Sequence, residues 1–285
     1  MKRRFAIAAC IVATAACAED DSARWYLRVD NDFFFHTDRW YTSGVRIGRV
    51  KDGLEWGIVQ ELYTPEAKYQ SPTLQDRAPA GRLLATVAKH VDGDVTFDTF
   101  ELDAGVRGPS ALGKQAQNSV HSVVDSGAIV DWERQLPDEF DVSAIAVRTL
   151  SLPAGFRTHF GAVLGNQVTF AHAGIEWRYG EPRTPSSSLM RFAATPPFAK
   201  VNVQGWSAYI GASARGVARN ELLSKNYYTF GPELEKKSEV TRVAGGIAWA
   251  QPWGNLTFDL AEDSREFVGQ RKPQAFGSIA LHVGF

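Results

Sequence analysis

The sequence predicts an all-β protein, an antiparallel transmembrane barrel of about twelve strands with a short helix in one outer loop. Three observations lead to this fold class. Apolar and polar residues alternate along many segments, and these segments are around ten residues long. Aromatic residues gather at the segment ends, namely Trp25, Tyr63, Trp177, Tyr179, Trp249 and Trp253. Period-two alternation is typical of strands, and about ten residues cross a bilayer as a tilted strand. A water-soluble sandwich would also alternate, but aromatic belts at strand ends favour a membrane.

The first eighteen residues are expected to be a cleavable leader. The sequence begins with a basic segment, continues with the apolar run FAIAACIVATAACA, and carries the small-residue pattern Ala-Cys-Ala at 16–18. This order is typical of a signal peptide. We therefore expect residues 1–18 to be removed and residues 19–285 to form one outer-membrane barrel domain. A lipoprotein anchored through Cys17 is the alternative, which Thr14 disfavours because a larger aliphatic residue is usual there.

The composition excludes several classes of protein. Both cysteines, Cys10 and Cys17, lie in the expected leader, so the mature chain has no disulfide framework. The formal net charge is −1 at pH 7 and becomes more negative without the basic leader, so we expect no nucleic-acid partner. No apolar run approaches the ~20 residues of a spanning helix. This criterion does not detect the strands of a barrel, because their apolar residues alternate with polar ones.

The alternation places twelve strands along the chain. In the last of them, Ile279, Leu281 and Val283 alternate with small or polar residues, and the chain ends on an aromatic residue. The expected strands are 24–32, 43–50, 54–62, 81–90, 95–106, 139–150, 157–165, 168–179, 203–215, 239–250, 254–261 and 275–285.

An even strand count places both termini at the periplasmic side, so that odd-numbered connections face the cell exterior. The short links are then periplasmic, as is typical of such barrels; they are 51–53, 92–94 and 252–254. The long links are then exterior, at 63–80, 107–138, 216–238 and 262–274. One link breaks the rule, because 180–198 is long and yet falls on the periplasmic side. Either a strand nearby is miscounted or this turn is large.

One segment predicts a helix, GKQAQNSVHSVVDS at 113–126, in the middle of a long outer loop. Gln117 and His121 are four residues apart on it, so their side chains share a face. Asn31 and Asp32 end the first strand on the outer side, and Thr42 begins the strand that returns. Polar groups from separate segments are therefore expected to converge at the outer rim.

Two stretches, NDFFFHTDRWYTSG and RGPSALGKQAQNSVH, resemble the outer-membrane lipid A 3′-O-deacylase family (LpxR-type). The resemblance extends over the mature chain and includes YTPE in the second outer loop and DWERQL after the helix. It implies a twelve-stranded barrel of the Gram-negative outer membrane that hydrolyses the 3′ acyl ester of lipid A. The implied partners are lipopolysaccharide and the membrane itself, with the active site at the extracellular side.

The resemblance also implies a calcium-dependent mechanism similar to that of phospholipase A2. His121 would activate water, and Asp32 and Asn31 would bind the metal. Asn31, Thr42 and Gln117 would support catalysis by positioning water or the ester carbonyl. The chemistry is reasonable, because neutral imidazole with a pKa of ~6.5 can accept a proton from water and a hard cation stabilises an oxyanion.

Several alternatives stay open at this point. His121 could be a solvated loop histidine, and Asp32 could line a polar barrel interior. Ser119 and Ser122 flank His121, but neighbours one or two residues apart on a helix do not face each other, which disfavours a serine nucleophile. A non-enzymatic barrel, either a narrow pore or a surface-structural protein, is the alternative function. The accepted lipid A acylation pattern, the physiological metal and the oligomeric state cannot be read from the sequence.

Overall fold

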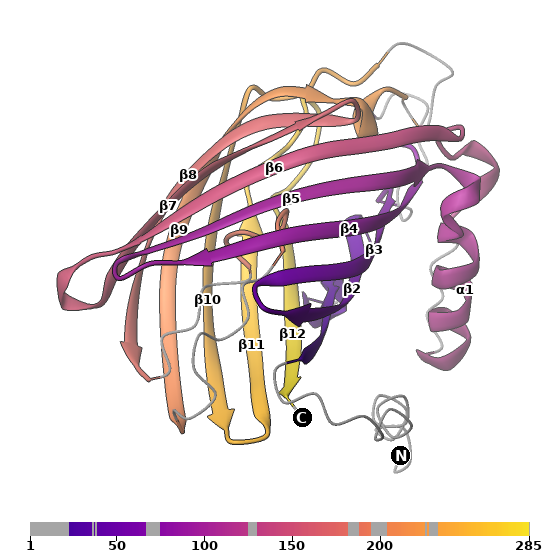
Figure 1. Ribbon diagram of the computed structural model, residues 1–285. Helices are drawn as coiled ribbons and strands as arrows, with labels where there is room; N and C mark the ends of the chain where they lie inside the picture. The colour runs from indigo at the N-terminus through magenta and orange to yellow at the C-terminus, as the bar shows by residue number, and fades with distance from the viewer. Residues whose placement is uncertain are drawn as a thin grey trace.

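The protein is a closed antiparallel barrel of twelve strands, in which each strand pairs with its sequence neighbours and β1 pairs with β12 (Figure 1). This confirms the predicted fold class. The computed structural model describes residues 23–284 except 36, 38, 67–74, 125–129, 182–187, 195–203, 226 and 228–232, and it does not describe the side chains of 121–124. The expected leader, residues 1–18, lies outside the described residues.

All twelve predicted strands are present. They are β1 (Arg24–Asn31), β2 (Trp40–Lys51), β3 (Leu54–Thr64), β4 (Ala80–Asp92), β5 (Thr96–Arg107), β6 (Glu139–Ser151), β7 (Phe156–Gly165), β8 (Val168–Gly180), β9 (Gly205–Asn220), β10 (Glu239–Gln251), β11 (Gly254–Asp263) and β12 (Gln274–Gly284). The predicted helix is α1 (Gly113–Val124). The largest differences from the expected boundaries are at β2, which begins three residues earlier, and at β9, which ends five residues later.

The two rims of the barrel differ in their connections. At the rim that carries both chain ends, here called the near rim, most turns are short, as the sequence predicts. The β2–β3 turn is a two-residue hairpin in which Asp52 and Gly53 have φ of 52° and 71°. Positive φ at both positions matches the twist of the adjoining strands. Most of the long connections, including the one that carries α1, lie at the opposite end, here called the far rim.

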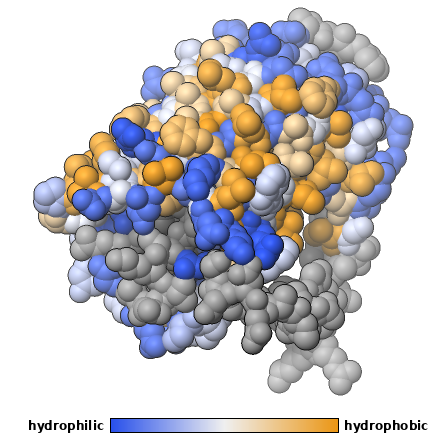
Figure 2. All heavy atoms as spheres, in the orientation of Figure 1, coloured by the Kyte–Doolittle hydropathy of each residue, from blue (hydrophilic) through white to orange (hydrophobic). Residues whose placement is uncertain are grey.

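The outer wall of the barrel is apolar. Alternate side chains such as Val45, Ile47 and Ile58 point outward and are exposed, and Figure 2 shows hydrophobic residues across the visible wall between hydrophilic edges. Rings gather at the near rim, where the ring of Tyr179 lies 5.8 Å from that of Trp206. This is the apolar band with an aromatic girdle that a bilayer requires.

Tyr63 departs from the expected girdle. It is buried and points into the lumen, where its ring lies 5.6 Å from that of Tyr41. The reason is strand parity, because Leu62 takes the outward position on β3. Within the described residues, no helix is long and apolar enough to cross a membrane.

Ion pairs line much of the lumen. Arg46 donates to Glu55 at 3.1 Å and to Glu101 at 2.6 Å, and all three side chains are buried. Nearer the far rim, Arg82 bridges Glu61 and Asp141, with both N–O distances 2.7 Å. A buried charge is costly unless it is paired and hydrogen-bonded. The polar interior therefore holds the strands in one register.

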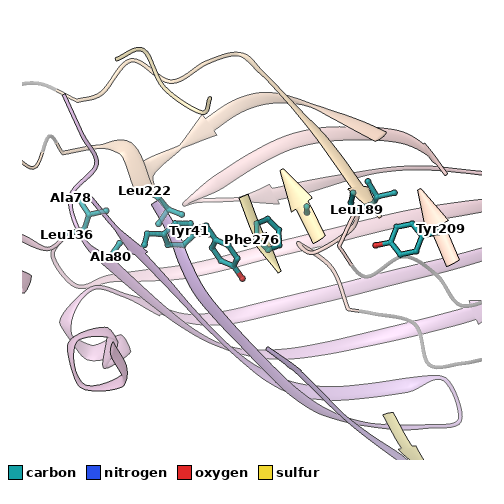
Figure 3. Close-up of a cluster of buried hydrophobic side chains, with 11 residues drawn as sticks. Tyr41, Ala78, Ala80, Leu136, Leu189, Tyr209, Leu222 and Phe276 are labelled. Atoms are coloured by element: carbon teal, nitrogen blue, oxygen red, sulfur yellow. The ribbon is translucent and has the colours of Figure 1, made fainter. Parts of the chain in front are cut away.

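The long near-rim link resolves the difficulty noted in the sequence, because its described part, Ser188–Ala194, folds back into the lumen. We call these residues the plug. Arg242 donates to the carbonyl of Ser188 at 2.6 Å, and Arg28 donates to the carbonyl of Arg191 at 2.9 Å. In Figure 3, Leu189 lies beside Tyr209 within the barrel. The strand count is therefore correct, and the link is long because it enters the barrel.

The plug also supports β2 and β3 from inside. The guanidinium of Arg191 lies 3.7 Å from the ring centroid of Tyr41 and donates to Glu61 at 2.9 Å. Tyr41 in turn donates to Asp30 on β1 at 2.7 Å. One plug residue thus connects three strands that also form the outer wall near α1.

A disulfide test checks the position of the plug. The hydroxyl oxygens of Ser188 and Ser278 are 3.5 Å apart, which suits a disulfide between cysteines at these positions. We expect the double variant Ser188→Cys, Ser278→Cys to form an intramolecular disulfide, seen as faster migration on a non-reducing gel. Residues 19–285 contain no natural cysteine that would compete.

The matched control replaces Ser188 and Ser110, because Ser110 is exposed beside α1 on a far-rim segment. This pair should remain reduced. A plug outside the lumen would leave the Ser188–Ser278 pair reduced as well.

Candidate functional site

Helix α1 lies outside the barrel wall, beside β3 and β4 (Figure 1). Gly113 permits this close approach, because a Cβ at that position would lie 2.9 Å from the ring of Trp132 and 3.1 Å from Leu62. Gln60, on the outward face of β3, donates to the carbonyl of Ala111 at 2.8 Å, just before the helix. The first turn of the helix is thereby fixed against the wall.

Gln117 is held toward the wall by a residue that the sequence analysis did not single out. The indole Nε1 of Trp132 donates to Gln117 Oε1 at 2.8 Å, and both side chains are buried. Trp132 lies in the motif DWERQL, which was noted only as part of the family resemblance. The motif contained the signal, but a contact across fifteen residues has no local pattern by which it could be found.

Thr42 lies at an irregularity in the barrel wall. The pairing of β2 with β3 shifts between Tyr41 and Ser43, so that Thr42 is an extra residue, a β-bulge. Bulges re-aim side chains and occur next to active sites. The hydroxyls of Thr42 and Thr64 are 2.5 Å apart, and both residues are buried. Thr64 is a second contributor to the site that sequence reasoning missed.

Asn31, at the end of β1, and Phe34, just after it, lie on the outer side of the barrel wall. Asn31 follows the outward parity of Val29, and its Oδ1 accepts from the backbone of Phe33 at 2.7 Å. Phe34 covers Gly277 on the outside of β12, with its ring 5.6 Å from that of Phe258. The rings thus face the apolar exterior.

Asp32 is buried and organises the first far-rim loop. Its Oδ2 accepts from the hydroxyl of Thr37 at 2.9 Å and from the backbone N–H of Arg39 at 2.8 Å. Aspartate commonly caps its own loop in this way. Its carboxylate therefore fixes the chain that leads from Asn31 to Thr42.

A pocket lies between α1 and the outer wall. It brings together Asn31, Thr42 and Gln117, three of the predicted site residues, from three separate elements. Asp32 follows the lining residue Asn31 in the sequence but does not itself line the pocket. The side chain of His121 lies outside the described residues, although its backbone belongs to α1, one turn after Gln117. The other lining residues are Ser43, Val45, Gln60, Leu62, Ala116 and Val120.

Comparison with known proteins matches residues 5–285 to the family model described as "Outer membrane protein LpxR". The chain belongs to the LpxR family. A solved structure of LpxR from Salmonella typhimurium is similar over 92% of this chain and 100% of that chain, with a TM-score of 0.78 and 19% sequence identity. The LpxR family and the barrel fold together place this protein in the outer membrane.

Two other barrels show a weaker likeness. The translocator domain of the autotransporter NalP from Neisseria meningitidis gives a TM-score of 0.45 at 8% identity over 94% of this chain and 90% of that chain. The NanC porin gives a TM-score of 0.43 at 7% identity over 92% of this chain and 98% of that chain. A comparison with curated protein sequences found no match.

The donor atoms in and next to the pocket between α1 and the outer wall include oxygen atoms of the kind that calcium prefers. Asn31, Asp32, Thr42 and Gln117 all offer oxygen atoms, and Ca²⁺ binds hard oxygen ligands from carboxylates, carbonyls and water. Among the described residues, no group of three or more His, Cys, Asp or Glu side chains could hold a metal ion. A site with a single carboxylate, Asp32, fits weak calcium binding because affinity rises with the number of charged ligands.

The far-rim loops meet at Asp76, close to the start of β2. Its carboxylate accepts from Trp40 Nε1 at 3.1 Å and from the backbone of Glu66 at 2.7 Å. Burial raises the pKa of Asp76 to about 6, although these donors favour the charged form. An acidic group with a raised pKa loses folded-state stability as the pH rises from its ordinary value of 3.8 toward 6. The stability that this group contributes to the loops is therefore largest below pH 3.8 and is lost as the pH rises through about 6.

The contact between Trp132 and Gln117 predicts how firmly α1 is attached. Trp132→Phe keeps a smaller aromatic ring and removes the indole donor, and the loss of this hydrogen bond costs about 1 kcal/mol. We expect the amides of α1 to exchange with solvent about fivefold faster, measured by hydrogen–deuterium exchange and mass spectrometry. Exchange in β6 to β9 should not change. Unaltered exchange in α1 would show that the helix is held by other contacts.

Proposed function

We propose that this chain hydrolyses the 3′-O-linked acyl ester of lipid A in the outer leaflet of the outer membrane. Membership of the LpxR family supports this function. The observation that carries the proposal is the pocket between α1 and the outer wall, which joins polar groups of β1, β2 and α1. In this proposal the far rim is extracellular, and the pocket opens at the depth of the lipid headgroups.

The lining of the pocket suits an ester with attached acyl chains. Val45, Leu62 and Val120 are apolar, while Asn31, Thr42 and Gln117 supply amide and hydroxyl groups. A lipid substrate that approaches from the membrane would place its chains along the apolar outer wall. Its ester would then reach the polar end of the pocket without leaving the bilayer.

His121 is the proposed general base. It follows Gln117 by one helical turn, so a side chain from this position shares the face of α1 that carries Gln117. A neutral imidazole takes a proton from the attacking water and can return it to the departing alkoxide. Gln117 and Thr42 are proposed to orient the water or the ester carbonyl, since Trp132 and Thr64 fix their positions.

Asp32 and Asn31 are the residues proposed to hold calcium. When bound, the ion would stabilise negative charge on the ester oxygen. Asp32 accepts hydrogen bonds from the first far-rim loop through Oδ2. As a ligand, it would hold the ion beside this loop. The division of roles between these two residues is part of the proposal.

Two alternative readings receive less support. Ser119 Oγ donates to the backbone carbonyl of Gln115 at 2.8 Å within α1, which does not suit a serine nucleophile. The plug lies within the lumen, which does not suit an open pore. The serine hydrolase and the porin are therefore less compatible with this structure than water-mediated ester hydrolysis.

The test of the function is deacylation of purified lipid A by the refolded protein, followed by mass spectrometry. Wild type should release the 3′ acyl group, and His121→Ala should lose activity by about 10² to 10⁴, the usual contribution of a general base. Chelation of calcium should abolish the wild-type activity, and added calcium should restore it.

Ser119→Ala is the matched control on the same helix and should keep wild-type activity. An inactive wild type that is folded and supplied with calcium would reject the enzyme proposal. Full activity of His121→Ala would reject only the assignment of the base.

A further inference from the structure

A second cavity lies inside the barrel, with no lining residue in common with the pocket under α1. It has a volume of about 80 Å³ and lies between the far rim and the plug. Lys237, at the far-rim end, is exposed, whereas Arg191 and Phe192 of the plug line the cavity from below. The cavity is therefore reached from the far rim and closed toward the near rim.

One side of this cavity is rich in cationic side chains. Six lining residues are basic: Arg46, Arg77, Arg82, Arg191, Arg215 and Lys237. Three are acidic: Glu61, Asp103 and Glu266. The lining itself carries more positive than negative groups, but Glu101, Asp141 and Asp263 behind it pair with Arg46, Arg82 and Arg215. The preference for an anion therefore rests on the N–H groups of the lining arginines that are left without an acceptor.

The carboxylates on this side are shared between guanidinium groups. Glu61 accepts from Arg82 at 2.7 Å and from Arg191 at 2.9 Å. Glu266 lies 3.2 Å from Arg77 and 3.8 Å from Arg215, the nearest N–O distances. A guanidinium group has five N–H donors and can bind two oxygens of one anion at once. Because each of these carboxylates is shared by two arginines, some arginine N–H groups are left to bind a further acceptor.

Some of the donors on this side have no partner in the described part of the chain. The Nε–H groups of Arg77, Arg191 and Arg215 are buried and make no hydrogen bond there. Arg77 and Arg191 are 0% and 8% exposed. A buried donor without an acceptor is costly, so an acceptor in the cavity would be stabilised by them.

The other side of the cavity is apolar, although barrel interiors are ordinarily polar. Ile145, Val163 and Phe170 belong to one cluster there, and Met190 and Ala193 of the plug join it. Val168, Phe192 and Val217 pack against this cluster and also line the cavity. The cavity thus lies between an ionic wall and an apolar wall.

We propose that the barrel lumen holds a binding site for a small amphipathic anion, a carboxylate or phosphate group attached to a short apolar chain. The anionic group is bound by the arginines around Glu61 and Glu266. The apolar chain packs on Ile145, Phe170 and Val217. Because the plug closes the cavity below, the molecule enters and leaves at the far rim. This site is independent of the proposed ester hydrolysis.

Binding is tested with hexanoate, hexyl phosphate, hexanol and inorganic phosphate by saturation-transfer NMR. The protein is held in phosphatidylcholine nanodiscs, and empty nanodiscs are the blank. Hexanoate and hexyl phosphate should both bind, about tenfold or more tightly than hexanol and inorganic phosphate. Hexanol binding as tightly as hexanoate would overturn the ionic half of the site. Inorganic phosphate binding as tightly would overturn the apolar half, and the absence of any hexanoate signal would overturn the proposal.

A matched pair of variants locates the site. Val217 is half-buried at the cavity wall, so Val217→Gln and Val217→Glu differ only in charge at nearly equal size. Both variants lose the apolar contact of Val217, so both should bind hexanoate less tightly than wild type does. The glutamate variant should bind it about tenfold or more less tightly than the glutamine variant, because its charge repels the anion. Equal affinities for the two variants would contradict the site.

A second variant keeps the test decisive if Val217→Glu does not fold. Arg215→Gln removes one of the cations while preserving a side chain that can hydrogen-bond. This variant should bind hexanoate and hexyl phosphate about tenfold less tightly than wild type, and its affinity for hexanol should be unchanged. Unchanged affinity for hexanoate would overturn the proposal.

Discussion

The closure of the barrel determines to which side of the wall the side chains of its strands point. Each strand is paired on both sides, so successive residues alternate strictly between the lumen and the exterior. Asn31, the last residue of β1, therefore points outward, whereas Asp32 begins the short 3-10 helix that follows and caps the loop that leads to β2. The one extra residue in the β2–β3 pairing, Thr42, interrupts this alternation. Because of it, Tyr41 can face the lumen while Ser43 and Thr42 line the outer pocket.

The two sides of the wall are coupled by the same few residues. Inside, Arg191 of the plug stacks on Tyr41 and pairs with Glu61. Outside, the next residues of β2 meet Thr64 and the pocket beneath α1. Since buried ion pairs are stable only in good geometry, the ionic interior resists deformation of this wall. A rigid wall is what positions polar groups for chemistry at an interface where the membrane itself is fluid.

Local patterns in the sequence were sufficient for the barrel and insufficient for what fills it. Alternation identified all twelve strands, because a lipid-facing strand must alternate, and helical spacing identified α1. The plug could not be predicted, because Ser188–Ala194 has no periodicity and its position depends on Arg28 and Arg242, distant in sequence. Tyr63 was misplaced for a similar reason, since parity rather than residue type decides its side of the wall.

The candidate site was likewise predicted only in part from the sequence. Asn31, Thr42 and Gln117 were selected by motif, and the structure brings them to one pocket. Their supporting partners, Trp132 and Thr64, were not selected, because hydrogen bonds between separate elements leave no mark in either segment alone. The bulge at Thr42 likewise depends on the register of β3 and not on the residues of β2.

Lipid A mass spectrometry on cells that produce Ala116→Trp tests the outer pocket most directly. Ala116 lines the pocket from α1, whereas Asn118 is exposed on the same helix and serves as the control position. A tryptophan at 116 should fill the space for the ester and lower 3′ deacylation about 100-fold, while Asn118→Trp should retain it. Full deacylation by a folded Ala116→Trp protein would show that the ester is cut elsewhere and would contradict the account.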